Sequence, residues 1–243
     1  MKVSFLPALV FSLIGLLFCS GDIPDNTRPD NQQELDFADL PLNIIKGKGD
    51  NKKNIISLFF SGDGGWFGFE QSVAEHLADF GVTTIGIDTR KYFWNRKTPE
   101  KTASDITGLL SHYGKEWGST GYMISGYSQG AEIVPFVINR LPEEIKSRVI
   151  SGVMLSPEST TDFEVHISNM LGLGNRHNTY DVTGEISRIK NIHLLCIFGK
   201  DENTDVPEIL KNKNVEIKFV PGNHHYKSNA ALIVQTMRDS KAF

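Results

Sequence analysis

A serine lies between two glycines, each two residues away, in the pentapeptide Gly126-Tyr127-Ser128-Gln129-Gly130. This spacing is typical of a serine held in a sharp turn between a strand and a helix, where the residues two positions away must be small. An apolar segment precedes the turn and a segment with helical spacing follows it. The motif therefore predicts that Ser128 is a nucleophile. The alternative is a glycine-rich turn with an incidental serine.

Two histidines, His224 and His225, follow the last predicted strand within residues 221–226. A histidine has a pKa near neutral, so it can take a proton from a serine and return it. We favour His225 as the base because the aromatic residue Tyr226 follows it, and we expect His224 to support it or to lie on the surface. Paired histidines also suggest a metal site, but adjacent histidines are poorly placed to bind one ion. We therefore predict neither a metal nor a cofactor.

An acidic segment follows the predicted strand that ends near residue 198. In serine hydrolases of the α/β type, the acid that orients the histidine lies between the serine and the histidine in the chain. Asp201 and Glu202 are the leading candidates because they come two or three residues after the glycine that ends the strand. Asp205 is a third candidate. A charged loop by itself is usually only a solvated surface, so this prediction depends on its position.

A glycine-rich segment, SGDGGW at residues 61–66, follows the first predicted core strand. In this fold such a loop supplies one backbone N–H to a developing oxyanion, and the residue after the nucleophile supplies the other. We assign these donors to Asp63 and Gln129. A phosphate-binding loop is the alternative, but the segment lacks the lysine and the serine or threonine that such a loop requires.

These segments come at the ends of regularly spaced apolar runs. The runs predict strands over residues 55–60, 82–87, 121–125, 149–155, 192–198 and 215–220. The helical periodicity predicts helices over residues 73–80, 102–113, 131–139 and 229–238. Apolar strands that alternate with helices indicate a mostly parallel sheet covered by helices on both faces, here the α/β-hydrolase fold. Sites in such sheets form at the carboxyl ends of the strands.

The amino-terminal segment differs in kind from the rest of the 243 residues. An apolar run over residues 3–18 ends at Cys19 and is typical of an export signal, either of a lipoprotein or of a freely secreted protein. We predict a signal peptide over residues 1–19, a polar tether over 20–39 and one hydrolase domain over 40–243. The protein is expected to be exported, either freely secreted or anchored to a membrane through Cys19.

Charge and cysteine content limit the function further. The net charge is −4, which gives no electrostatic reason to expect nucleic acid binding. The two cysteines are Cys19 and Cys196, so removal or lipidation of Cys19 leaves no partner for a disulfide. We expect Cys196 to be a buried thiol on a strand.

Several motifs together resemble the bacterial virulence protein VirJ and the related AcvB: FSGDGGW, DTRKYFW, GYSQGAE, NRLP, LSPE, DFEVH and PGNHHY. The resemblance runs from about residue 55 to residue 226. It implies a periplasmic enzyme that hydrolyses the aminoacyl ester of lysyl-phosphatidylglycerol, with Ser128 as nucleophile, the base at His224-His225 and Glu202 as the best match to the acid. The chain departs from the pattern at Val206-Pro207, where a cysteine is common.

The resemblance also implies residues that contact the substrate. Trp66 and Trp94 are candidates for an aromatic wall at the mouth of the site, although the aromatic block at residues 92–94 is equally compatible with a core. Asp88 is a candidate for binding a cationic head group, or it caps the following turn. The expected partner is an aminoacylated phospholipid at a membrane surface. The alternatives are an esterase that acts on other esters and a non-catalytic, VirJ-like partner in secretion-system assembly.

Overall fold

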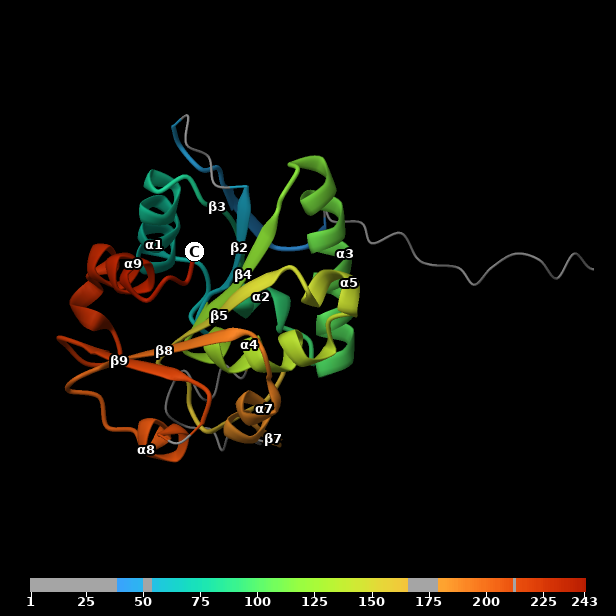
Figure 1. Ribbon diagram of the computed structural model, residues 1–243. Coiled ribbons are helices and arrows are strands. Elements are labelled where there is room, and N and C mark those ends of the chain that lie inside the picture. The colour runs from blue at the N-terminus through green and yellow to red at the C-terminus, as the bar shows by residue number, and fades with distance from the viewer. Residues whose placement is uncertain (1–38, 50–53, 166–178, 212) are drawn as a thin grey trace, which may run out of the picture. The chain divides into compact units, whose positions relative to one another are not determined.

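The computed structural model in Figure 1 describes residues 39–49, 54–165, 179–211 and 213–243. The predicted signal peptide, Cys19 and nearly all of the predicted tether lie outside these residues. The division of the chain into leader, tether and domain therefore stays a prediction. Within the described ranges, no helix is both long enough and apolar enough to cross a bilayer.

A seven-stranded sheet forms the centre of the described domain, in the order β1-β3-β2-β4-β5-β8-β9. The strands of this sheet are β1 (Leu42–Ile45), β2 (Ile55–Phe60), β3 (Thr83–Ile87), β4 (Gly121–Tyr127), β5 (Val149–Leu155), β8 (His193–Gly199) and β9 (Glu216–Val220). Strand β1 pairs antiparallel with β3, and every other neighbouring pair in the sheet is parallel. Two short strands, β6 (Thr160–Thr161) and β7 (Tyr180–Asp181), form a separate antiparallel pair.

Helices cover both faces of the sheet. They are α1 (Gly68–Asp79), α2 (Thr89–Tyr92), α3 (Pro99–Glu116), α4 (Gln129–Arg140), α5 (Glu143–Lys146), α7 (Val182–Arg188), α8 (Val206–Leu210) and α9 (Ala230–Asp239). Figure 1 shows α1 beside α9 on one side of the sheet and α3, α4 and α7 on the other. The architecture confirms the predicted α/β-hydrolase fold class.

The core is divided by the sheet into two layers. Successive side chains of a strand point to opposite faces, and in β2 Leu58 and Phe60 pack in the layer with α3 and α4, whereas Phe59 packs with α1 and α9. The β2, β4, β5 and β8 strands are almost wholly buried, which explains why they read as continuous apolar runs. Cys196 of β8 is fully buried as predicted, and burial raises the pKa of its thiol.

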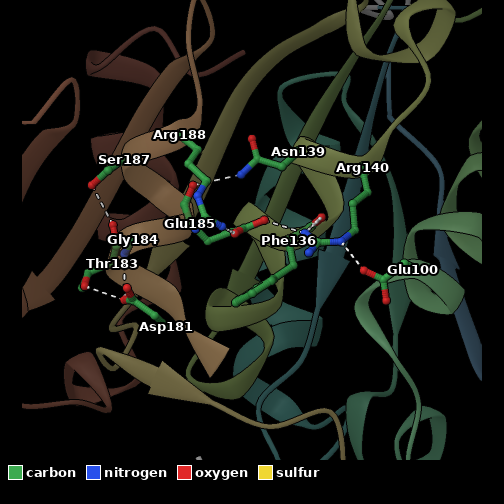
Figure 2. A network of polar contacts seen from close by, with 10 residues as sticks. All are labelled: Glu100, Phe136, Asn139, Arg140, Asp181, Thr183, Gly184, Glu185, Ser187 and Arg188. Atoms are coloured by element: carbon green, nitrogen blue, oxygen red, sulfur yellow. Dashed lines mark hydrogen bonds and ion pairs between the residues drawn. The ribbon is translucent and has the colours of Figure 1, made fainter. Parts of the chain in front are cut away.

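A polar network joins the carboxyl end of α4 to its neighbours (Figure 2). The Arg140 guanidinium lies 2.5 Å from the buried Glu185 of α7 and 2.9 Å from Glu100 of α3. Arg188 binds the second carboxylate oxygen of Glu185. Asn139 adds a hydrogen bond of 2.9 Å to the Glu185 carbonyl. The network therefore fixes α4, the helix that begins directly after Ser128, to α3 and α7.

Candidate active site

Ser128 lies in the tight turn between β4 and α4, with φ 53° and ψ −123°. A positive φ is unfavourable for a residue with a side chain, so the surrounding packing must hold the turn. A Cβ on Gly126 would lie 2.3 Å from the Gly130 carbonyl oxygen, and a Cβ on Gly130 would lie 2.3 Å from the carbonyl oxygen of Ser61. Only glycine fits these two positions, which is the geometry that the motif predicted.

The histidine against Ser128 is His224. Its Nε2 lies 3.0 Å from Ser128 Oγ, and its Nδ1 lies 2.8 Å from Glu202 Oε1. An ionised carboxylate only accepts hydrogen bonds, so the Nδ1–H of His224 donates to Glu202 and Nε2 is left to accept from the Ser128 hydroxyl. Ser128, His224 and Glu202 thus form one continuous chain of hydrogen bonds.

The expectation that His225 faces Ser128 is wrong. His225 is exposed, and its Nδ1 lies 3.0 Å from the Tyr127 hydroxyl. Its backbone N–H donates to the Asn223 side chain at 3.1 Å, and the Tyr226 N–H donates to the Asn223 carbonyl at 2.9 Å. These bonds close a tight turn in which the two histidines reach different partners, Ser128 for His224 and Tyr127 for His225, and their rings stand at 85° to each other.

Of the three predicted acids, the structure brings only Glu202 to the histidine. Asp201 is exposed, one residue earlier in the same loop. Asp205 is also exposed and stands at the N-cap of α8. The loop is fixed to the segment after β9, because the Lys200 N–H donates to Val220 at 2.8 Å and the Asp201 N–H donates to Gly222 at 2.9 Å. The carboxyl ends of β4, β8 and β9 therefore bring the serine, the acid and the histidine to one edge of the sheet.

Charges and hydrogen bonds at this edge of the sheet shift the pKa values of His224 and Glu202. The hydrogen bond that His224 donates to Glu202 is the main reason that the pKa of His224 is raised above its ordinary value. Burial opposes this rise, and the nearby Glu158 and Glu132 add to it. Burial alone would raise the pKa of Glu202, but hydrogen bonds from His224, Ser156 and the Gly199 N–H outweigh it and lower the pKa. Glu202 is therefore held as a carboxylate.

The glycine-rich loop lies directly beside Ser128. A Cβ on Gly62 would be 3.6 Å from Ser128 Cβ, and Gly62 and Gly65 form a small bridge that places Asp63 at the tip. Glu70 of α1 holds this loop by accepting from the Gly62 N–H at 3.4 Å. Asp63 lines the cavity at Ser128, and Gln129 is the first residue of α4. Both predicted oxyanion donors therefore stand next to the serine, while their role stays a prediction.

Two cavities meet at this site. The first, about 500 Å³, contains Ser128 and is lined by the glycine loop, by both histidines and by aromatic side chains of Phe67, Phe69 and Tyr127. The second, about 670 Å³, lies beyond Glu202 and is lined by acidic and polar residues of the loops after β5, β8 and β9. His224 and Glu158 line both cavities.

A match to a known protein family shows to which family this chain belongs. A model of the bacterial virulence protein VirJ matches residues 54–242. The chain belongs to the VirJ family. No curated protein matches the sequence.

Solved structures with low sequence identity share the fold of this VirJ-family chain. A lipase-esterase related protein from Clostridium acetobutylicum ATCC 824 superposes with a TM-score of 0.60 at 16% identity, over 82% of this chain and 99% of that one. Est1E from Butyrivibrio proteoclasticus superposes with a TM-score of 0.58 at 15% identity, over 83% and 94%. XC6422 from Xanthomonas campestris, described as an α/β serine hydrolase without a lid, gives 0.57 at 9% identity, over 82% and 86%.

Three predicted substrate residues of the VirJ-family chain lie elsewhere. Asp88 is buried, accepts from the Lys91 N–H at 3.1 Å and caps α2, so the structure favours the capping alternative. Trp66 packs edge-on against Phe59 and donates to Gln71 at 2.9 Å. Trp94 is 52% exposed. None of the three is among the described residues that line the two cavities at Ser128.

Sequence reasoning missed four residues of the VirJ-family site: Phe67, Phe69, Glu158 and Ser156. Phe67 and Phe69 line the serine cavity from the start of α1, and their signal was only their position directly after the glycine loop. Glu158 and Ser156 belong to the segment after β5, which is the sheet neighbour of both β4 and β8. This position of β5 was the signal for both residues, because the segment after a strand that lies between two functional strands begins at the same edge of the sheet.

Among the described residues, no group of three or more histidine, cysteine, aspartate or glutamate side chains is arranged to bind a metal ion. What the arrangement offers is acid–base chemistry: a serine hydroxyl, a histidine that can take its proton and a carboxylate that orients the histidine.

Proposed function

We propose that this VirJ-family chain is a serine hydrolase that cleaves carboxylic esters through an acyl-enzyme. The observation that carries the proposal is the contact of 3.0 Å between Ser128 Oγ and His224 Nε2, continued at 2.8 Å to Glu202. A nucleophile, a base and an orienting acid within hydrogen-bond reach are what activation of a serine requires. In this proposal Glu202 is the acid and neither Asp201 nor Asp205 takes part in proton transfer.

The proposed reaction has two halves. Ser128 Oγ attacks the ester carbonyl carbon while His224 Nε2 takes the hydroxyl proton, and the carbonyl oxygen becomes an oxyanion. The N–H groups of Asp63 and Gln129 stabilise that charge, an interaction that is typically worth about 3 kcal/mol per donor. His224 then gives the proton to the leaving alcohol. Water attacks the acyl-enzyme in the same way and releases the acid.

For the substrate, we propose the aminoacyl ester of an aminoacyl-phosphatidylglycerol, with a cationic amino acid such as lysine on the acyl side. The family resemblance motivates the lipid, and the electrostatics of the site favour the cation. Glu158, Asp201 and Asp205 line the larger cavity, and Asp63 lines the smaller one. Neither described lining contains a lysine or an arginine. A cavity lined by one sign of charge attracts a ligand of the opposite sign.

The proposed substrate also indicates where the enzyme acts. An aminoacylated phospholipid is a membrane component, so we propose that the exported protein meets it at the membrane surface of the bacterial envelope, free in the periplasm or anchored through Cys19. The rival with a separate mechanism is a VirJ-like assembly role that needs no chemistry at Ser128. The two differ in one respect that can be measured, which is turnover.

The test incubates the purified protein with vesicles of phosphatidylglycerol that contain lysyl-phosphatidylglycerol, and measures released lysine by mass spectrometry. The protein with Ser128→Ala is the control, and a fluorophosphonate probe reports the reactive serine. We expect lysine release and labelling at Ser128, both absent in the variant. Turnover of uncharged short esters without lysine release would leave the hydrolase and remove the lipid. Neither turnover nor labelling would favour the assembly role.

The cation preference is tested at Glu158, which lines both cavities. Glu158→Gln should lower kcat/KM for the lysyl lipid roughly 3- to 10-fold more than for an uncharged ester, as expected for one ionic contact in a partly exposed site. If the substitution also alters His224, the hydrolysis of both substrates changes by the same factor, and this factor cancels in the ratio of the two kcat/KM values. Glu144→Gln, an exposed carboxylate on α5, is the matched control. Equal losses on both substrates would assign the cation to another group.

A further inference from the structure

Both carboxylate oxygens of Glu202 are bound, and only one of them by the histidine. Oε1 accepts from His224 at 2.8 Å. Oε2 accepts from the Ser156 hydroxyl at 2.6 Å and from the Gly199 N–H at 3.1 Å. A carboxylate can rotate about its terminal torsion, so the contacts on Oε2 decide whether Oε1 keeps facing the imidazole.

The backbone of Ser156 is strained. It follows the last residue of β5, it is fully buried, and its φ is 48°. Its N–H donates to the Ile197 carbonyl at 2.9 Å, which fixes the backbone between β5 and β8. A glycine would adopt this φ without strain. A strained residue with a side chain persists when its surroundings over-determine it, and such residues cluster at functional sites.

A buried tyrosine supports Ser156 from behind. The Tyr226 hydroxyl lies 2.5 Å from Ser156 Oγ and 2.9 Å from the Ile197 carbonyl oxygen. A serine hydroxyl has one hydrogen and two lone pairs. Ser156 donates its hydrogen to Glu202, and the Ile197 carbonyl can only accept, so the single hydrogen of the Tyr226 hydroxyl is shared between the Ile197 carbonyl oxygen and Ser156 Oγ. Burial raises the pKa of Tyr226, so the phenol keeps the proton that it donates.

We propose that Ser156, supported by Tyr226, is a positioning residue that holds the Glu202 carboxylate toward His224. The proposal rests on the proposed function, since it assigns a role to Ser156 through the acid of that mechanism. Among the described residues, Ser156 is not in the lining of the cavity that contains Ser128, and its hydroxyl contacts Glu202 and Tyr226. Loss of its hydroxyl leaves the Gly199 N–H as the remaining donor to Oε2, and Glu202 then orients His224 less well.

The kinetic test uses Ser156→Gly, with Ser156→Ala as a second variant. Glycine removes the hydroxyl and also relieves the positive φ, so the fold should tolerate it. We expect kcat for an uncharged ester to fall about 10- to 100-fold, as for a lost hydrogen bond to a charged group, with KM changed less than about twofold. Tyr226→Phe should give a smaller loss of the same kind, because Ser156 still reaches Glu202.

The matched control is Ser151→Ala in β5, the strand that Ser156 follows. Ser151 is also fully buried, and its hydroxyl donates to the Ala242 carbonyl at 2.6 Å. We expect its removal to leave kcat unchanged. A double-mutant cycle then separates positioning from general damage. In the Glu202→Gln background, Ser156→Gly should lower kcat by less than about threefold. A full additional loss, or an equal loss from Ser151→Ala, would overturn the proposal.

A readout without substrate keeps the inference distinct from the proposed function. Histidine NMR of the full chain follows the Nδ1–H of His224, whose hydrogen bond to Glu202 shields it from exchange. We expect this resonance to broaden or shift in Ser156→Gly and to stay unchanged in Ser151→Ala. If the protein hydrolyses no ester, the proposed function fails, and this resonance alone decides the role of Ser156. An unchanged resonance in Ser156→Gly would overturn that role.

Discussion

Two glutamates of this domain, the partly buried Glu202 and the buried Glu185, each belong to a network of hydrogen bonds, but the partners in the two networks differ. The Glu202 side chain is 10% exposed and the Glu185 side chain 3%. Both carboxylates are bound on both oxygens. Glu185 is bound by Arg140 and Arg188 (Figure 2), whereas Glu202 is bound by His224, Ser156 and the Gly199 N–H.

The difference lies in what the partner can do with a proton. Arginine stays protonated at any ordinary pH, so the partners of Glu185 cannot take a proton from a nucleophile, and the network serves to join helices. Histidine titrates near neutral pH, and His224 touches both a carboxylate and a serine hydroxyl at the edge of a cavity. A bound carboxylate therefore does not mark an active site by itself. In the proposed function, Glu202 differs from Glu185 because its titratable partner, His224, also reaches the Ser128 hydroxyl.

The sharpest way to break this comparison is to remove the histidines one at a time. His224→Ala should lower kcat for an uncharged ester by roughly 10⁵- to 10⁶-fold, because members of such a unit fail together. His225→Ala should cost less than about tenfold, since His225 contacts the Tyr127 hydroxyl and not Ser128. Steady-state kinetics measure the two losses, and circular dichroism checks the fold. Equal losses of kcat from His224→Ala and His225→Ala would mean that the contact with Ser128 does not identify the base.

The second test asks whether the Glu185 network is structural. Glu185→Gln removes the charge that the part-exposed Arg140 faces, and Arg140 keeps its contact with Glu100. We expect a loss of about 2 kcal/mol in the free energy of unfolding, below the roughly 3–5 kcal/mol that is typical when a fully buried pair is broken. Thermal melting should show a decrease in Tm of about 4–8 °C, with kcat within twofold of the unchanged protein. A large loss of kcat in a folded variant would put Glu185 in the chemistry.

Much of the fold followed from the sequence. The strands over 55–60 and 149–155 were predicted to the residue, because wholly buried parallel strands are continuous apolar runs. Strand β1 was not predicted, since its four residues are partly buried or exposed and pair antiparallel at the edge. Helix α1 begins five residues before the predicted 73, because its first turn contains glycine and aromatic residues rather than a periodic apolar pattern.

The site was predictable in type and less so in detail. Spacing located Ser128 and restricted the acid and the base to two short loops, but not to single residues. Which histidine faces Ser128 depends on the turn that Asn223 closes. In such a turn, a shift of one position along the sequence is enough to point a side chain the other way, and the sequence does not show this shift. Asp88 illustrates the same limit, since a carboxylate at the end of a strand equally suits a ligand or the cap of the next helix.

The smallest expected effect, and the finest test of the comparison, is a shift on the pH axis. Glu202 raises the pKa of His224, with Glu158 and Glu132 adding to it and burial opposing it. Only the neutral imidazole can take the serine proton, so kcat/KM should fall as the pH drops through this raised pKa, with a midpoint above about 6.5. Glu202→Gln removes the charge and leaves at most a weaker, neutral hydrogen bond to His224, so the midpoint should move to lower pH on a reduced plateau. Glu185→Gln should leave the midpoint in place, because Glu185 is not among the charges that shift His224. The profiles are measured with an uncharged, activated ester between pH 5 and 9. A midpoint that stays fixed in Glu202→Gln, or that moves in Glu185→Gln, would show that the two glutamates do not differ in the way their partners imply.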